Sequence, residues 1–594
     1  MKNKYYVQIL FFLVLSVLFT HQLWDNTENW GTDAWYFYET YYDYARTSII
    51  EEKVFPLWNR YLCGGHVFLE HPQISILPMK YFFTLLFGTL IGIRLFLVFY
   101  MTLGMFGMYL LSRQLGLKNI FAFFPPIAFI LTSLDLFAYG GDFHLSITYI
   151  PFVFYFLLKS ETKKKFILLS ALFTALILLD NGVYLYLYTI LFVFLFCFVS
   201  FVVNFIRNYK SNVNRINLKF LKLFLIFIFF VVLFTLPKSF SIIEIMNDNP
   251  RKIESLHLGF TIEKYFDSLL FRDQISYYKN NYYDVIKTGL NESKYYDIKD
   301  KPWKAWHDVG NYIGIVLFIF SLIGMIFYKN RIMFFILLIF LWLSFGNSLK
   351  YSLWNLLSKF PLWDSLRDPV RFNVYVVFIL SIFAGIGAYM LYRIILKFLN
   401  KKNSSLIDQK KRFILYLFYI IFIFVIIDLY LVHSPVFGET FLVKPPEFVL
   451  KNQNLEFFQE WQNLDEVYYT NEDHSVCLYC AYLENRGLIN CYDATPLDIS
   501  AIPLTDKKYK GEAYFYNGFK IKRIDYKPNK FIVTFDELLE DDLLIVNQNF
   551  YKYWNVKNKK VESYNGLLSV SVNKGENQII FIYRPIFIEI LIYY

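Results

Sequence analysis

Side chains able to do acid–base or phosphate chemistry gather in residues 30–80, directly after the first apolar segment. This stretch reads WGTDAWYFYETYYDYARTSIIEEKVFPLWNRYLCGGHVFLEHPQISILPMK. Its candidate catalytic and binding side chains are Asp33, Asn59, Arg60, His66 and His71. A carboxylate can act as a general base, and an imidazole as an acid, a base or a metal ligand. The stretch therefore predicts the lip of an active site on the outer face of a membrane enzyme.

Two further polar groups occur later in the chain. GGDFHLSITY from Gly140 contains Asp142 and His144, and SLRDPVRF from Ser365 contains Arg367 and Arg371. The planar fork of an arginine suits a phosphate, with which it can form two parallel hydrogen bonds. The alternative is that both arginines anchor a membrane span at the lipid headgroups.

The elements that position these residues follow from composition. The chain has 594 residues, of which 56% are apolar, 21% aromatic and only 18% charged. Apolar runs near twenty residues recur, and a soluble protein could not bury so many of them. The net charge of +10 does not indicate nucleic acid, because the basic residues lie in short loops between these runs. The sequence predicts a polytopic α-helical membrane protein.

Hydropathy predicts eleven spans in a membrane domain of residues 1–432. They are residues 6–22, 91–111, 119–138, 143–158, 166–180, 183–206, 219–236, 311–328, 332–345, 370–392 and 413–432. No small-x-small cleavage site follows the first of them, so an uncleaved span is favoured over a signal peptide. The apolar stretch 81–90 is expected to lie along the membrane interface.

Loop charge predicts the orientation. With the N-terminus in the cytoplasm, the loops that alternate onto the inner side are the basic ones, as the positive-inside rule requires. The opposite side then receives the outer loops 23–90, 237–310 and 346–369 and everything after residue 432. If one span were missed or added, every later loop would change sides, and the basic loops would no longer all lie on the inner side.

The tail, residues 433–584, has a different composition. Short alternating apolar runs, FIVTF from Phe531, LLIV from Leu543, LLSVSV from Leu567 and IIFIY from Ile579, are typical of strands. Pro528-Asn529, Asn565-Gly566 and Lys574-Gly575 lie between them as turns. The prediction is an extracytoplasmic all-β domain. Residues 585–594 form a short apolar tail.

The cysteines do not predict a disulfide framework, because five are too few for a chain of this length. Cys197 lies inside a predicted span and is expected to pack there. Cys477, Cys480 and Cys491 follow His474, and their spacing allows either a zinc site or a disulfide that leaves one thiol over. A disulfide is the favoured interpretation.

Four of these stretches, in this order, resemble the bacterial membrane proteins of the YfhO-like family. They are GTD after the first span, FPLWNRYLCGGHVFLEHPQ, GGDFHLSITYIPFVFYFL and SLRDPVRFNVYVVFILSIFAGIGAYML. The tail adds LLIVNQNFYKYWNV and GLLSVSVNKGENQIIFIYRP, which are similar to the outer β domain of that family. The tail departs from the pattern at Tyr553-Trp554, where a glycine usually precedes the tryptophan.

The resemblance implies a C-type (GT-C) membrane glycosyltransferase in a bacterial cytoplasmic (inner) membrane. Such enzymes take a sugar from a polyprenyl-phosphate-linked donor and carry an essential acid in the first outer loop, which Asp33 matches. A phosphate leaves without protonation, so an inverting transfer needs a base for the acceptor hydroxyl and positive charge for the leaving group. Arg367 and Arg371 are candidates for that charge.

The resemblance also implies the partners, which are the lipid-linked donor, an envelope glycan or glycolipid acceptor, and the bilayer. The candidate accessory residues are Asp142, His144, His66, His71, Asn59 and Arg60. A divalent metal would be compatible with these side chains, although nothing in the sequence requires one.

Other interpretations stay open at this stage. Asp33 could cap a helix, where a carboxylate gains about 0.3–1 kcal/mol from the helix dipole. Gly64-Gly65 is read as a turn, since no Walker-type Lys-Ser/Thr follows. The aromatic residues 35–44 recur at helical spacing and predict a helix lying on the bilayer. The alternative functions are a flippase for lipid-linked glycans and a noncatalytic assembly protein.

Overall fold

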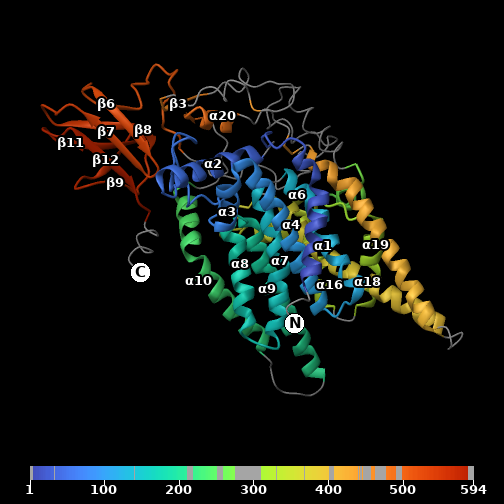
Figure 1. Cartoon of the computed structure of the whole chain (residues 1–594). Coiled ribbons are helices and arrows are strands. Elements are labelled where there is room, and N and C mark those ends of the chain that lie inside the picture. The colour runs from blue at the N-terminus through green and yellow to red at the C-terminus, as the bar shows by residue number, and fades with distance from the viewer. Residues whose placement is uncertain are drawn as a thin grey trace. The chain divides into compact units, whose positions relative to one another are not determined.

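Apolar helices form one part of the chain and strands form another, as the computed structural model in Figure 1 shows. The helical unit comprises Met1–Asn26, Leu95–Thr235 and Lys252–Thr440. The loop-and-sandwich unit comprises Thr27–Arg94, Leu236–Arg251 and Phe441–Tyr594. The structure describes all residues except 1–4, 32–33, 140, 211–217, 250–258, 274–309, 329–330, 367, 401–406, 439, 442–444, 446–455, 462–476, 490–497 and 586–594.

Long apolar stretches of sequence form the helices of the helical unit. They are α1 (Tyr6–Phe19), α4 (Thr89–Gln114), α5 (Phe124–Ile130), α6 (Leu134–Tyr139), α7 (Ile150–Ser160), α8 (Phe166–Leu179), α9 (Val183–Lys210), α10 (Lys219–Asp248), α11 (Ile262–Leu270), α15 (Ile315–Phe327), α16 (Ile332–Ser344), α17 (Leu353–Leu357), α18 (Asn373–Asn400) and α19 (Ile407–Gly438). Of these, α4 begins and α10 ends in the other unit.

Seven helical stretches of the described chain are long and apolar enough to cross a membrane. They are Thr89–Gln114, Asn119–Ala138, Asp142–Ser160, Val183–Ile206, Lys219–Asp248, Pro369–Phe398 and Gln409–Gly438. Four shorter apolar helices, α1, α8, α15 and α16, lie at the other four predicted segments. The polytopic helical fold is confirmed, and the count of eleven spans stays a prediction.

Glycines allow α18 to pack tightly against α15. A Cβ on Gly387 would lie 1.8 Å from the carbonyl oxygen of Phe320, and one on Gly324 would lie 2.1 Å from that of Phe383. Small residues let two helix backbones approach this closely, which is how helices gain packing energy in a lipid environment. The contact holds α18 in place directly after the turn that carries Arg371.

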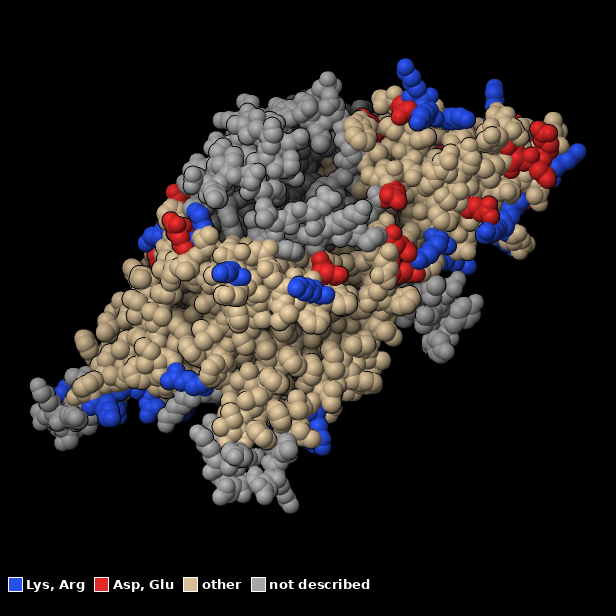
Figure 2. Space-filling view, turned by 180° about the vertical axis from the view of Figure 1, so that it is seen from behind, with Lys and Arg blue, Asp and Glu red and all other residues tan. Residues whose placement is uncertain are grey.

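Charged residues are sparse on the face of the helical unit that Figure 2 shows. Figure 2 shows a broad band there with neither Lys, Arg, Asp nor Glu, and a group of Lys and Arg along its lower edge. A band without charge is what the hydrocarbon core of a bilayer requires. The basic edge agrees with the loop charges from which the inner side was predicted.

The C-terminal strands form two antiparallel four-stranded sheets, in the orders β10-β11-β8-β5 and β6-β7-β12-β9. Their bounds are β5 (Ala513–Phe515), β6 (Ile521–Lys527), β7 (Lys530–Phe535), β8 (Asp542–Asn549), β9 (Trp554–Val556), β10 (Val561–Tyr564), β11 (Leu567–Val572) and β12 (Gln578–Tyr583). The predicted strand runs therefore correspond to β7, β8, β11 and β12. The predicted C-terminal β region is confirmed.

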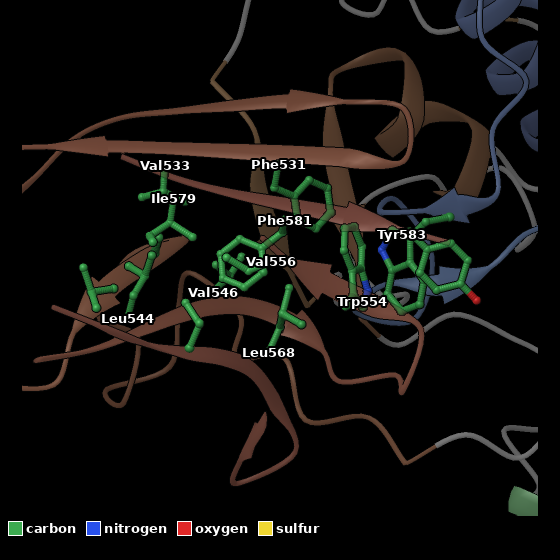
Figure 3. Packing of buried hydrophobic residues seen from close by; sticks show 14 of the residues in the cluster. Phe531, Val533, Leu544, Val546, Trp554, Val556, Leu568, Ile579, Phe581 and Tyr583 are labelled. Carbon is green, nitrogen blue, oxygen red and sulfur yellow. The ribbon is translucent and has the colours of Figure 1, made fainter. Parts of the chain in front are cut away.

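Apolar side chains alternate along these strands and meet between the two sheets (Figure 3). The labelled core residues are Phe531, Val533, Leu544, Val546, Trp554, Val556, Leu568, Ile579, Phe581 and Tyr583. At the hairpin between β10 and β11, Asn565 and Gly566 have φ values of 50° and 83°. Positive φ at both central residues is the requirement of a type I′ turn, for which Asn-Gly is the preferred pair.

A hairpin from residues 23–90, the loop that the sequence predicts to lie outside and that we call the first outer loop, completes this core. Strands β1 (Trp58–Asn59) and β2 (His66–Val67) pair antiparallel. The Trp58 ring centroid lies 5.3 Å from that of Trp554 and 5.2 Å from that of Tyr583, and Val67 belongs to the same buried cluster. The first outer loop and the β-sandwich are thus parts of one folded unit.

Three helices and a short parallel strand pair belong to the same unit. They are α2 (Ala34–Glu52), α3 (Pro78–Phe87), α20 (Cys477–Leu483), β3 (Phe458–Glu460) and β4 (Arg486–Leu488). Helix α2 is the predicted aromatic helix, but its rings at Trp35, Phe37, Tyr38, Tyr41, Tyr42 and Tyr44 are all buried. The helix therefore packs inside the unit, and the expectation that it lies on the bilayer is not supported.

Candidate functional site

A proline sets the local structure at Arg371. Asp368 precedes Pro369 and has extended backbone, with φ −115° and ψ 90°, because a residue before proline is kept out of the α region. Pro369 then opens the 3₁₀ helix Pro369–Phe372, where its missing N–H is not needed. This turn leads directly into α18.

The Arg371 side chain is buried among two aromatic rings and one carboxylate. Its guanidinium carbon lies 4.4 Å from the ring centroid of Tyr184 and 5.3 Å from that of Phe143. Its Nη2 lies 3.3 Å from Oδ2 of Asp368, and the two side chains are only 9% and 6% exposed. The rings and the carboxylate therefore hold the plane of the guanidinium in a fixed orientation.

Asp142 lies beside this arginine site, at the start of the 3₁₀ helix Asp142–Tyr149. Its Oδ2 accepts a hydrogen bond of 3.0 Å from Nδ2 of Asn181, and both residues are buried. Asn181 precedes α9 and has a φ of 60°. The following residue, Gly182, packs so closely that a Cβ there would lie 2.1 Å from Oγ of Ser146. This close approach keeps the Asn181 turn against the 3₁₀ helix.

His144 occupies the same 3₁₀ helix and is buried. Its ring centroid lies 3.9 Å from that of Phe143, which also contacts Arg371. The structure thus brings the predicted group at 140–149 together with the predicted group at 365–372. We call Asp142, His144, Asn181, Asp368 and Arg371 the Arg371 cluster.

The Arg371 cluster combines a fixed guanidinium with two carboxylates, an amide and an imidazole. These are groups that bind phosphate oxygens and sugar hydroxyls through charged and neutral hydrogen bonds. Their low exposure strengthens each electrostatic interaction relative to water. Such a group can bind a phosphorylated sugar and stabilise charge that develops on its phosphate.

The other two leading candidates, Asp33 and Arg367, lie outside the described residues. Their roles therefore rest on the sequence. The described chain stops at Gly31 and begins again with α2 at Ala34.

Asn59 and Arg60 serve the packing of the first outer loop. Asn59 Oδ1 accepts a hydrogen bond of 3.0 Å from the backbone N–H of Tyr61. The Arg60 guanidinium carbon lies 4.6–5.4 Å from the ring centroids of Tyr61, Phe457 and Tyr526. Its Nη1 also donates to the carbonyl oxygen of Tyr526 at 3.0 Å. These contacts join the loop to the sandwich.

His66 and His71 are neighbours, with ring centroids 4.9 Å apart. Nδ1 of His66 lies 2.7 Å from the carbonyl oxygen of Val67, so that nitrogen carries the proton of the hydrogen bond. Nδ1 of His71 accepts from the backbone N–H of Gln73 at 3.1 Å. Both side chains are buried and support the conformation of the loop.

Glu70 is a buried acid that the sequence interpretation missed. Its Oε1 accepts a 2.9 Å hydrogen bond from the Tyr583 hydroxyl. Burial raises its pKa from 4.5 to about 7, although hydrogen bonds and the charge of Lys238 oppose the shift. Lys238 donates to the carbonyl oxygens of Leu69 and His71 at 2.6 and 2.7 Å. The sequence signal for this buried site was Lys238, a charged residue that follows Pro237 in an otherwise apolar helix.

Glu39 is a second missed acid. It is fully buried in α2, and burial raises its pKa from 4.5 to about 8 against the opposing hydrogen bond from Gly31 and the charge of Arg94. Asp43, one helical turn later, accepts from the Thr89 hydroxyl at 2.5 Å and from the Tyr479 hydroxyl at 3.1 Å. The sequence signal was the spacing of Glu39 and Asp43, two acids four residues apart in a helix rich in aromatic residues.

The cysteines differ from the favoured interpretation. Cys63 is disulfide-bonded. Cys480 and Cys197 are buried thiols that form no disulfide, and Cys197 lies inside α9. In the described part of the chain, no three His, Cys, Asp or Glu side chains come together as metal ligands would.

No protein-family model matches the chain, and no curated protein matches it. It is similar to the solved structure of arabinofuranosyltransferase AftD from Mycobacteria, with 12% identity and a TM-score of 0.39 over 73% of this chain and 27% of that chain. It is also similar to ArnT from Cupriavidus metallidurans bound to undecaprenyl phosphate, with 11% identity and a TM-score of 0.42 over 83% and 87%. The chain thus spans about a quarter of the length of AftD. Each of these is a likeness of fold alone.

Proposed function

We propose that this protein is an integral membrane glycosyltransferase. It transfers a sugar from a polyprenyl-phosphate-linked donor to an envelope glycan or glycolipid on the outer face of the membrane. The transfer is a single, inverting displacement in which Asp33 is the base and Arg371 stabilises the departing phosphate.

The burial of Arg371 is the observation that carries this proposal. An arginine that only anchors a helix at the headgroups extends its charge toward water. Arg371 instead keeps a 9% exposed side chain between two rings and beside Asp368. Taking a charged group out of water costs several kcal/mol, so stability alone does not favour the arrangement. A fixed, desolvated fork is suited to recognising a phosphate.

The role of Asp33 follows from the chemistry of the reaction. The acceptor hydroxyl must lose a proton as it attacks the anomeric carbon, and a carboxylate can take that proton. The bond from the anomeric carbon to the phosphate oxygen breaks, and the phosphate leaves as an anion. One acid is therefore enough, whereas an inverting glycosidase needs a second one to protonate its leaving group.

The ordered motifs support membership of the YfhO-like family. They also support a bacterial cytoplasmic membrane, with the N-terminus inside and the β-sandwich outside. Arg371 directly follows the predicted outer loop 346–369. A lipid-linked sugar would be presented on that outer side of the membrane.

The test uses purified full-length protein, polyprenyl-phosphate-linked pentoses and hexoses, and an extracted envelope glycan as the acceptor. Sugar transfer is followed by mass spectrometry. We expect transfer by the wild type, a loss of about 10²-fold or more in D33N, and a smaller loss in R371K, which keeps the charge without the fork. The matched control is R331K, because Arg331 is exposed and, among the described residues, donates to the carbonyl oxygens of Met325 and Ile326.

Other outcomes would redirect the proposal. If the wild type transfers no sugar from any donor while a control glycosyltransferase does, the protein is not this enzyme. Translocation of a lipid-linked glycan across liposomes, with D33N as active as the wild type, would identify a flippase.

A further inference from the structure

The outer face of one sandwich sheet carries a tyrosine from its edge strand. In β8, Leu544 and Val546 belong to the core between the two sheets (Figure 3). Successive side chains of a strand point to opposite faces, so Leu543 and Ile545 lie on the outer face. Tyr514 of β5 is the register partner of Ile545 and therefore shares that outer face.

Two more tyrosines lie close to Tyr514. The ring centroids of Tyr516 and Tyr564 are 6.0 Å apart, and their planes meet edge to face at 77°. Burial raises the pKa of the Tyr514 hydroxyl, and the nearby Tyr564 adds to the shift. Tyr514, Tyr564 and Leu543 pack partly buried around Ile545, whereas Tyr516 is 58% exposed. We call Leu543, Tyr514, Tyr516 and Tyr564 the tyrosine face.

A lysine lies over one ring of the tyrosine face. Nζ of Lys510 is 5.3 Å from the ring centroid of Tyr514, and the side chain is exposed. Among the described residues, no acid forms an ion pair with Lys510. Glu562, two residues before Tyr564 on β10, pairs instead with Lys560 at 3.0 Å. The ammonium group of Lys510 is therefore available to an anion.

Aromatic rings, hydroxyl groups and an ammonium group together match an acidic sugar. A sugar ring has an apolar face of C–H groups, which packs on an aromatic ring, and a rim of hydroxyls, which hydrogen-bond to a tyrosine hydroxyl. Tyrosine offers this contact area at a low cost in conformational entropy. Lys510 adds a positive charge for a carboxylate or a phosphate carried by the sugar.

The small size of the tyrosine face argues against a protein partner. A stable protein–protein interface buries about 800 Å² on each side. The tyrosine face offers three rings and one leucine, and only Tyr516 among them is more exposed than buried. A small, flat aromatic surface with one free cation suits a few sugar rings better than another folded protein.

We propose that the tyrosine face and Lys510 bind an acidic glycan, whose sugar rings pack on Tyr516 and Tyr564 and whose carboxylate or phosphate pairs with Lys510. This inference deepens the proposed function and rests on it for the identity of the glycan, which is the envelope acceptor. The binding site lies wholly within the sandwich, so its affinity for a glycan is measured separately from sugar transfer.

The test measures the binding of fluorescently labelled oligogalacturonate to the full-length protein in detergent, by anisotropy. A neutral galactan oligosaccharide of the same length and polyphosphate separate the contribution of the sugar from that of the charge. We expect the Kd for oligogalacturonate to rise about 10-fold or more in Y516A and about threefold in K510Q, which loses one exposed ion pair. K510Q should leave the weaker binding of the neutral galactan unchanged.

Y351A and K557Q are the matched controls. Tyr351 and Lys557 are exposed but do not belong to the tyrosine face, so both variants should bind oligogalacturonate as the wild type does. The melting temperature of Y516A should equal that of the wild type, because the Tyr516 ring is already 58% exposed. A merely structural role predicts a lower melting temperature instead.

Three results would overturn the proposal. The first is a wild type that does not bind oligogalacturonate, and the second is wild-type affinity in Y516A. The third is polyphosphate binding as tight as that of oligogalacturonate and insensitive to Y516A, which would identify an anion site without sugar recognition. A wild type that binds oligogalacturonate but transfers no sugar would refute the proposed enzyme and leave this binding site in place.

Discussion

Two regions of this molecule contain the same kinds of polar side chain and use them differently. In the first outer loop, Asn59, Arg60 and His66 all bond to backbone groups of the loop or of the sandwich. In the Arg371 cluster, Arg371 pairs with the side chain of Asp368, and Asp142 with that of Asn181. A side chain that bonds to backbone supports the fold. A fixed guanidinium beside carboxylate and amide side chains is instead suited to recognising a phosphate, so the cluster is the better candidate for a binding site.

The largest effect expected from this comparison is on catalysis. We predict that R371M lowers kcat/KM for sugar transfer by about 10²–10³, the loss measured when one donor to a developing negative charge is removed. R371K keeps the charge without the fork and should recover part of the rate. Steady-state transfer kinetics measure both. R371K also covers the case in which R371M leaves Asp368 buried without its partner and fails to fold.

The same substitution in the first outer loop provides the contrast. R60M removes an arginine that stacks on Tyr61, Phe457 and Tyr526, so we expect a lower melting temperature with kcat/KM within about twofold of wild type. If R60M and R371M damaged kcat/KM equally at matched stability, the distinction between the two regions would be wrong.

The sequence was sufficient for the apolar helices and for four of the strands, because these are set by local pattern. Alternation predicted β7, β8, β11 and β12, and Asn565-Gly566 predicted a turn, which the structure shows to have the positive φ values of type I′. Apolar runs placed a helix at every predicted span. These signals depend on neighbours two to four residues apart, which a single sequence displays.

Contacts between distant segments could not be read in the same way. No local pattern indicated that Trp58 packs in the sandwich core against Trp554 and Tyr583. The acids Glu39 and Glu70 gain their raised pKa values from burial, which tertiary packing decides. The contact between the Phe143 ring and Arg371 likewise joins segments far apart in the sequence, so no local pattern predicts it.

The Gly64-Gly65 turn tests whether the first outer loop is primarily structural. Gly65 has a φ of +103°, and a Cβ there would lie 2.4 Å from Oε1 of Gln548 and 2.8 Å from the Trp58 ring. We predict that G65A destabilises the protein by about 2–4 kcal/mol, from backbone strain and overpacking together. Thermal unfolding of full-length protein in detergent measures the loss.

G518A is the matched control for that substitution. Gly518 has a φ of +82°, but no atom lies within 4 Å of a Cβ built there. G518A should therefore destabilise the protein by the backbone strain alone, which costs about 1 kcal/mol. Equal losses in G65A and G518A would show that the close packing of the loop on the sandwich contributes nothing.

The smallest predicted effect concerns pH and Glu512, a buried acid whose role is stability. Its Oε1 accepts from the Gln459 N–H at 2.8 Å and from Tyr509 and Asn547. Burial raises its pKa from 4.5 to about 7, so the folded chain holds this proton more tightly than the unfolded chain. Its stabilising contribution is then complete below pH 4.5 and is lost as the pH rises through about 7.

Replacing this carboxyl with an amide should remove that dependence. E512Q keeps the acceptor oxygen and cannot ionise, so its free energy of unfolding should fall less than that of the wild type between pH 5 and 7. The two curves can differ in slope by at most about 1.4 kcal/mol per pH unit, since one proton is involved. Thermal melts of both proteins across this range measure it, with E540Q as the control for an exposed acid. Parallel curves for the wild type and E512Q would mean that Glu512 ionises in the folded protein without penalty.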